Sequence, residues 1–187
     1  MAISLSKGQN ISLEKQGSAL THFCVGVNWG MIVKKGWFSS GKEAVDLDAS
    51  VGLFNEQKQL VDKVYFGHKR SNCGSIQHSG DDLTGDDSDD GQDNEVIVVD
   101  LNRLPANVQQ LVFVLNSFRG QDFKDIPYAR IRLFEGKPDR IQQVVASFDI
   151  ANDAQFAGSV SMIMGKLYRH QGSWKFKAIG EATSDRR

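Results

Sequence analysis

The chain has 187 residues, of which 40% are hydrophobic and 24% are charged, and its formal net charge is −1. These values are typical of a soluble globular protein that is long enough to bury its own core. They do not suggest bulk nucleic-acid binding, because the basic residues are spread thinly, and no apolar run approaches the length of a transmembrane segment. We therefore predict a single domain over residues 1–187.

The N-terminal residues and the cysteines predict a cytoplasmic protein. The first residues lack the basic-then-apolar plan of a signal peptide. The two cysteines, Cys24 and Cys73, both lie in apolar or strand-like segments. We expect two buried free thiols rather than a disulfide.

Hydrophobic residues recur with a period of two along most of the chain, which is typical of strands. Gly, Asn, Asp and Ser separate these segments, as in short strands joined by turns. The predicted strands are 10–13, 22–29, 45–51, 60–66, 74–78, 95–101, 111–116, 128–135, 141–150, 159–170 and 174–179. Ten or eleven short strands without a long helix predict an all-β fold, an antiparallel β-sandwich with a few short helical turns.

Three further segments carry specific expectations. Residues 31–42 read as a loop, with Trp37 and Phe38 either buried beneath it or exposed as a contact. Residues 103–110 contain Pro105 and are predicted to form one helical turn at the end of the sheet. The strand at 111–116 is apolar throughout, so we expect both of its faces to be buried.

Segment 45–51 alternates most cleanly between its two faces. One face is apolar and the other is polar, with Val45, Leu47, Ala49 and Val51 on the first and Asp46, Asp48 and Ser50 on the second. Aspartate has a low strand propensity, so two on one face need a reason. Asp46 and Asp48 either lie on a solvated sheet edge or supply oxygen ligands to a cation.

Residues 80–95 form a strongly acidic loop between two predicted strands. Eight carboxylates lie in these sixteen residues, without a Lys or Arg among them: Asp81, Asp82, Asp86, Asp87, Asp89, Asp90, Asp93 and Glu95. The other 171 residues hold 15 acids and 22 bases, so the negative charge is concentrated in this one loop. Such crowding is unfavourable unless water or a cation screens it.

A hard cation with many oxygen ligands, Ca²⁺ above all, suits this loop better than Mg²⁺, which keeps its waters. Eight carboxylates exceed what one Ca²⁺ commonly takes, so we predict two ions. Residues 86–91 match the first half of an EF-hand loop, but Ile97 stands where that loop needs a bidentate Glu, and the flanks are strands. Asp93 and Glu95 are expected to close the site from the far side. The alternative is an unoccupied solubilising loop.

Short motifs along nearly the whole chain resemble those of the TerD-domain family of bacterial tellurium-resistance and stress-response proteins, especially its TerZ-like members. They are residues 5–8 (LSKG), 25–29 (VGVNW), 45–50 (VDLDAS), 78–85 (HSGDDLTG), 90–91 (DG), 94–95 (NE), 104–105 (LP), 116–121 (NSFRGQ), 167–170 (LYRH) and 174–176 (WKF).

The resemblance implies a Ca²⁺-binding β-sandwich, with two ions at the acidic loop. It implies a non-enzymatic part of a stress-response complex of proteins that is associated with the membrane. Asp46, Asp48 and Asp81 carry over directly, and Glu95 matches the family's terminal acid. The sequence departs from the commonest pattern at Asp82, where Asn is frequent, and over residues 86–92, which are longer than usual.

Two other functions remain open from the sequence. A two-metal phosphoester hydrolase would use the acidic cluster for catalysis, but no nucleophile motif, P-loop or zinc-protease motif is present. His78 lies beside the loop, and a structural role is favoured over a catalytic base. A Ca²⁺-dependent module for anionic membranes would use Trp37 and Phe38 for insertion. We expect a calcium-binding interaction or sensing module rather than an enzyme.

Overall fold

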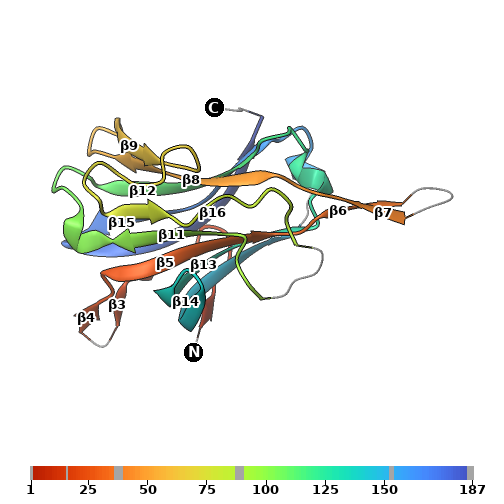
Figure 1. The fold of residues 1–187 in the computed structure, drawn as a ribbon. Coiled ribbons are helices and arrows are strands. Elements are labelled where there is room, and N and C mark those ends of the chain that lie inside the picture. Colours follow the sequence, from red (N-terminus) through yellow and green to blue (C-terminus); the bar gives the residue numbers. More distant parts are fainter. Residues whose placement is uncertain (1, 16, 36–39, 87–90, 152–153, 185–187) are drawn as a thin grey trace.

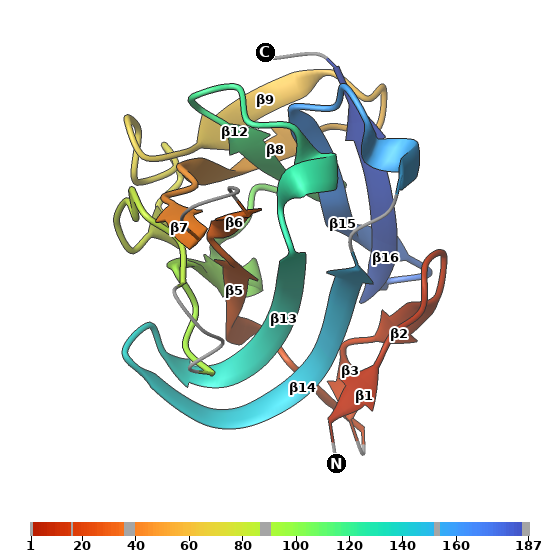
Figure 2. The same cartoon turned by 90° about the vertical axis from the view of Figure 1, so that its right-hand side faces the viewer.

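Two six-stranded sheets pack against each other in the computed structural model, which describes residues 2–15, 17–35, 40–86, 91–151 and 154–184 (Figure 1 and Figure 2). In spatial order the first sheet holds β1 (Ile3–Ser4), β14 (Arg140–Ala151), β13 (Tyr128–Lys137), β5 (His22–Trp29), β11 (Glu95–Asp100) and β10 (Ile76–His78). The second holds β2 (Asn10–Ser12), β16 (Ser173–Thr183), β15 (Ser161–His170), β12 (Gln110–Ser117), β8 (Leu47–Phe54) and β9 (Leu60–Val64).

The predicted β-sandwich is confirmed, but the number and length of the strands differ from the prediction. The described residues form sixteen strands, and β13 to β16 are ten to twelve residues long. Figure 2 shows β13 and β14 curving strongly, and their pairing contains two bulges, which increase local twist. Strand β1 pairs with β14 in parallel, an exception to the antiparallel prediction. Strands of two residues, such as β1, are too short to show a period in the sequence.

Residues 31–42, predicted as a loop, instead belong largely to a hairpin. β6 (Ile32–Lys35) pairs with β7 (Ser40–Glu43), and Figure 1 shows the pair at one end of the molecule, away from the two sheets. Gly and Lys have low strand propensity, but cross-strand pairing overrides that preference here. A second small hairpin joins β3 (Glu14–Lys15) to β4 (Ser18–Ala19). Trp37 and Phe38 lie outside the described residues.

The core lies between the sheets and is built from alternate residues of the strands. Phe23 and Trp29 of β5 enter it from one sheet, and Phe113 of β12 and Phe176 of β16 enter from the other, all nearly fully buried. The apolar face predicted for 45–51 is confirmed, since Val45, Leu47, Ala49 and Val51 are all buried. This face fixes the register of β8 and so turns Asp48 away from the core.

The prediction that 111–116 is buried on both faces is wrong. Burial alternates along β12, with Leu111, Phe113 and Leu115 in the core and Val112 and Val114 half-exposed. A central strand of a two-layer sandwich has only one layer to pack against, so its outer valines stay accessible even though the sequence is apolar throughout.

The helical segments are single 3₁₀ turns. The turn predicted over 103–110 lies earlier, as η1 (Leu101–Arg103), and the Asp100 side chain accepts a hydrogen bond from the Asn102 amide at its start. Leu104 is extended because it precedes Pro105, which disfavours helical geometry at that position. In the described part of the chain, no helix is long and apolar enough to cross a membrane.

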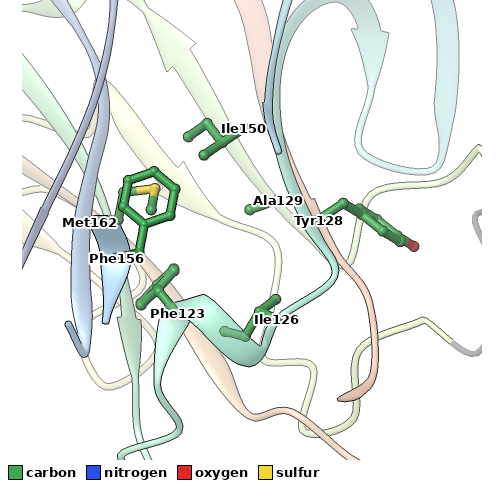
Figure 3. A pocket seen from close by; sticks show the side chains of 7 residues that line it. All are labelled: Phe123, Ile126, Tyr128, Ala129, Ile150, Phe156 and Met162. Carbon is green, nitrogen blue, oxygen red and sulfur yellow. The ribbon is translucent and has the colours of Figure 1, made fainter. Parts of the chain in front are cut away.

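The other two turns, η2 (Phe123–Asp125) and η3 (Ala154–Phe156), lie side by side near one end of the sandwich. Figure 3 shows the side chains of Phe123, Ile126 and Phe156 gathered with Met162 and Ile150, whereas the Tyr128 ring points away. The cavity among them is only about 10 Å³, scarcely room for one water molecule. These side chains therefore form packed core rather than a ligand site.

Candidate metal centre

Three carboxylates from two separate segments meet beside the start of β8. Asp46 directly precedes the strand, Asp48 lies within it, and Asp81 follows β10 in the acidic loop. One oxygen from each lies within 4.8 Å of the others. Oxygens that bind one Ca²⁺ at about 2.3–2.6 Å can lie up to about 5 Å apart, so this spacing fits a single ion.

Asp46 and Asp48 are buried, at 3% and 7% exposure, whereas Asp81 is exposed. The alternative of a solvated sheet edge for the two strand aspartates is therefore wrong. Burial, together with the charges of Glu95, Asp46 and Asp81, raises the pKa of Asp48 to about 7, and His78 opposes this rise. The one described ion pair of Asp46 is with the half-exposed Arg119, whose Nε lies 3.1 Å from Oδ2. The cluster thus concentrates negative charge in a place with little water.

Glu95 and His78 form a buried wall behind this cluster. Strand β9 pairs with β8 only from Val51 onward, so Ala49 has no strand partner on that side. Its amide donates to Glu95 Oε2 at 2.7 Å, and its carbonyl accepts from His78 Nε2 at 3.1 Å. The Gly80 amide donates to His78 Nδ1, which places the imidazole proton on Nε2. His78 therefore has a structural position, hydrogen-bonded at both ring nitrogens.

Asp82 closes the first turn of the acidic loop. Its Oδ1 accepts hydrogen bonds from the amide and hydroxyl of Thr84 and from the amide of Gly85. Burial acts to raise the pKa of Asp82, but these bonds and one from Asn94 hold it below its usual value. Gly85 has φ +71°, and a Cβ there would lie 2.8 Å from the Trp29 indole, so glycine is needed for both reasons.

Two asparagines that the sequence did not single out hold Asp86. Asn28 donates to Oδ2 at 2.5 Å and Asn94 donates to Oδ1 at 2.7 Å. The backbone of Asp86 also pairs with Trp29 and Met31 at the end of β5. The motif VNW at 27–29 contained this signal, because a polar Asn between two buried residues of a central strand needs a partner.

The side chain of Asn28 also carries an oxygen that accepts no hydrogen bond. This atom, Oδ1, is fully buried and has no hydrogen-bond partner among the described residues. Buried carbonyl oxygens are rarely left unpaired, and a cation is one of the groups that satisfies them. This oxygen therefore offers a ligand beside Asp86, separate from the three-carboxylate cluster.

Asp93, predicted as a ligand, lies in a buried ion pair. Both of its carboxylate oxygens lie near Arg132 Nε, at 2.8 and 2.9 Å, although only the bond to Oδ2 has good hydrogen-bond geometry. Arg132 also donates to the Gly91 carbonyl at 2.6 Å. Burial raises the pKa of Asp93, against the opposing charge and hydrogen bond of Arg132.

Gly26 of β5 makes room for this ion pair. A Cβ at this position would lie 1.9 Å from Asp93 Oδ2. We expect Gly26→Ala to displace the carboxylate and to lower the free energy of unfolding by about 1–3 kcal/mol, measured by urea denaturation. Gly41→Ala is the matched control, because a Cβ there meets nothing within 4 Å, and it should change stability by less than about 0.5 kcal/mol. Equal effects of the two substitutions would contradict this view of Asp93.

The structure therefore brings only part of the predicted ligand set together. Asp46, Asp48 and Asp81 form the three-carboxylate cluster. The carboxylates of Asp82, Asp86, Asp93 and Glu95 are all hydrogen-bonded to protein groups. Asp87, Asp89 and Asp90 lie outside the described residues.

Both cysteines are free, as predicted, but only Cys24 is buried. Burial and the charge of Asp93 raise the pKa of Cys24 to about 11, so its thiol is unreactive at neutral pH. Cys73 is half-buried. Burial acts to raise its pKa, but hydrogen bonds from Ser71 and Ser75 lower it below the ordinary value.

Comparison with known proteins shows which family the chain belongs to. The sequence profile of the TerD domain matches residues 1–186. The chain belongs to the TerD domain family. It is 38% identical to "Tellurium resistance protein TerZ" of Serratia marcescens, over 98% of this chain and 92% of that protein. It is also 38% identical to "Stress response protein SCP2" of Bacillus subtilis (strain 168), over 100% of this chain and 96% of that protein.

The fold is also found among solved structures. A crystal structure of a homologue of the telluride resistance protein TerD from Streptomyces coelicolor superposes with a TM-score of 0.64, at 18% identity, over 90% of this chain and 93% of that chain. At this identity the likeness concerns the fold alone. The TerD-domain resemblance seen in the motifs is confirmed by the family match over residues 1–186.

Proposed function

We propose that this protein is a calcium-binding, non-enzymatic interaction or sensing module in bacterial tellurite resistance and general stress response. The observation that supports it best is the meeting of Asp46, Asp48 and Asp81, with three oxygens within 4.8 Å and two of the three side chains buried. Buried carboxylates crowded in this way are unfavourable in the absence of a positive partner. Membership in a tellurium-resistance and stress-response family supports the biological role.

The chemistry of the donors favours Ca²⁺. All of them are oxygens, they come from a strand and a long loop, and several more carboxylates lie within the same loop. Ca²⁺ accepts six to eight oxygens in flexible geometry, whereas Mg²⁺ prefers few carboxylates and keeps its waters. We propose a second ion beside Asp86, supported by the unpartnered, buried Oδ1 of Asn28.

In this proposal the ion changes the order of the loop rather than performing a reaction. Asp81 belongs to the loop and Asp46 and Asp48 belong to the start of β8, so a shared ion would tie the two segments together. The ordered loop would then form the surface that other proteins of a membrane-associated stress-response complex recognise in the cytoplasm.

Calcium should stabilise the protein against heat. At a Ca²⁺ concentration a hundred times Kd, binding to the folded state alone adds about 2.7 kcal/mol. For a chain of this size, that raises Tm by roughly 5–10 °C. Mg²⁺ at the same concentration should give a much smaller shift. Differential scanning calorimetry with Ca²⁺, with Mg²⁺ and with EGTA measures this.

The variant Asp48→Asn tests whether the Ca²⁺-dependent rise in Tm comes from the three-carboxylate cluster or from the negative charge of the protein in general. It should lose most of the Ca²⁺-dependent shift, yet melt no lower than the wild type in EGTA, because it removes a carboxylate that Glu95, Asp46 and Asp81 crowd. Asp139→Asn is the matched control, because Asp139 is exposed in the β13–β14 hairpin, and it should keep the full shift. Identical melting curves in Ca²⁺ and EGTA would refute the proposal.

A further inference from the structure

The outer face of the second sheet carries a groove that the metal centre does not explain. Its volume is about 560 Å³, within the range of pockets that hold small molecules. It lies over β8, β9 and β12, which are neighbours in that sheet (Figure 1). Val112 and Val114, the two outward valines of β12, belong to its floor. The groove is thus lined by apolar side chains that do not pack into the core between the sheets.

Aromatic side chains form one wall of the groove. Tyr65 and Phe66 follow β9, and Phe118 follows β12. The rings of Phe66 and Phe118 meet edge to face at 6.0 Å, although Phe118 is 68% exposed. Exposed aromatic residues beside an apolar floor are typical of a surface that binds something.

Polarity changes steadily along the groove. The register pairs Asn116 with Asp48 at one end, Val114 with Ser50 in the middle, and Val112 with Gly52 beyond. Phe54 and Leu60 line the far end. A ligand that matches this lining has a polar head at the Asp48 end and an apolar body that extends along β12.

Two charged side chains lie in the lining of the groove. Lys63 lies in the wall, with its Nζ 5.4 Å from the centre of the Tyr65 ring. Asp48 belongs both to the groove and to the three-carboxylate cluster. A Ca²⁺ ion held by that cluster would offset two of its three negative charges, and because Ca²⁺ takes six to eight oxygens, it would accept an anionic oxygen from a ligand at a position that the three carboxylates leave open. Without the cation, the Asp48 carboxylate opposes an anionic ligand.

We propose that the groove binds a single amphipathic carboxylate, with its apolar chain over Val112 and Val114 and its carboxylate beside Asp48, on the cation that the metal centre holds. This inference rests on the proposed function and adds a ligand class to it. One molecule is favoured over a bilayer, because the floor is recessed beside the Phe66 and Phe118 wall. Ligand and Ca²⁺ then strengthen each other's binding by the same factor.

The test uses the fluorescent probe dansylaminoundecanoic acid and its methyl ester, titrated into the full-length protein with Ca²⁺ or with EGTA. The acid should bind at least about tenfold more tightly with Ca²⁺, within the usual range of coupling between two sites. The ester lacks the carboxylate, so Ca²⁺ should not change its affinity.

Two variants locate the probe. Val114→Phe fills the floor and Phe118→Ala opens the wall, and each should weaken binding of the acid by about tenfold or more. Phe118→Ala alters an exposed side chain and so keeps the test valid where Val114→Phe fails to fold. Val61→Phe is the matched control, since Val61 is exposed on β9 outside the groove lining, and it should leave the affinity unchanged.

The outcomes separate this inference from the proposed function. A Ca²⁺-dependent rise in Tm without binding of the acid, or with binding that Val114→Phe and Phe118→Ala leave unchanged, overturns the inference and leaves the calcium site intact. Equal affinity in Ca²⁺ and EGTA also overturns it, because the carboxylate then does not meet the cation. Ca²⁺-dependent sedimentation with phosphatidylserine vesicles that both variants abolish would replace the single molecule by a membrane and likewise overturn it.

Discussion

Replacing Arg132 by alanine is expected to lower the free energy of unfolding by about 3–5 kcal/mol, as measured by urea denaturation. The guanidinium and the Asp93 carboxylate are both nearly buried, with side-chain exposures of 10% and 2%. Removing the guanidinium takes the hydrogen-bonded positive partner from a buried carboxylate next to β5, and it takes a donor from the Gly91 carbonyl. A chain of this kind has a total stability of only about 5–15 kcal/mol, so this single change approaches the limit of folding.

The neighbouring Arg130 provides the control for this prediction. It lies two residues away on β13 and pairs with Asp149, but the Asp149 side chain is 59% exposed. Because solvent screens such a pair, Arg130→Ala should lower the free energy of unfolding by no more than about 1 kcal/mol. Similar losses for the two variants would mean that the Asp93 pair is not the reason that Arg132 matters.

The arginines also show where sequence reasoning ends. Along β13, Ile131 and Leu133 alternate in the sequence with Arg130 and Arg132, and the two apolar residues are fully buried. Alternation distinguishes the faces of a strand, but not which polar residue lies beneath a loop. Arg132 is buried because the end of the acidic loop crosses its part of β13, and that contact joins residues far apart in the chain.

Most of the fold followed from local pattern, because a period of two and the spacing of turns are properties of adjacent residues. The errors have the same origin. The apolar run 111–116 does not reveal that its sheet has a covering layer on one side only, and the short strands β1, β3 and β4 have too few residues to show a period. The β6–β7 hairpin depends on pairing between segments of poor strand propensity.

The sequence likewise predicted one part of the candidate site and missed another. Composition identified the acidic loop, and alternation singled out Asp46 and Asp48, which the structure places against Asp81. The number of acids did not reveal that protein donors take the carboxylates of Asp86 and Glu95. Two of those donors, the Asn28 side chain for Asp86 and the Ala49 backbone amide for Glu95, come from segments far from the loop in the sequence, and a charge count does not record them.

The second large effect is expected at Trp29, the residue that joins the core to the acidic loop. Its side chain is fully buried, and its indole Nε1 donates to the Val45 carbonyl at 2.9 Å. Gly85 lies against the ring, and the backbone of Trp29 bonds to Asn94 and Asp86. Trp29→Ala removes the ring that contacts Val45 and Gly85 and should lower the free energy of unfolding by about 3–5 kcal/mol.

This substitution should also reduce the response to calcium, which a purely structural core residue would not do. Asp46 and Asp48 come one and three residues after Val45, and Asp81 lies in the same loop as Gly85. A cavity under Val45 and Gly85 would therefore let Asp81 move away from Asp46 and Asp48.

Trp174 is the matched control. It is half-buried on strand β16, away from the acidic loop. The guanidinium of Arg169 lies 4.7 Å from its ring. Trp174→Ala should cost less stability and keep the full Ca²⁺-dependent rise in Tm, whereas Trp29→Ala should lose most of that rise under conditions where it remains folded. A full rise in the folded Trp29→Ala protein would show that the metal centre assembles without the core beneath it.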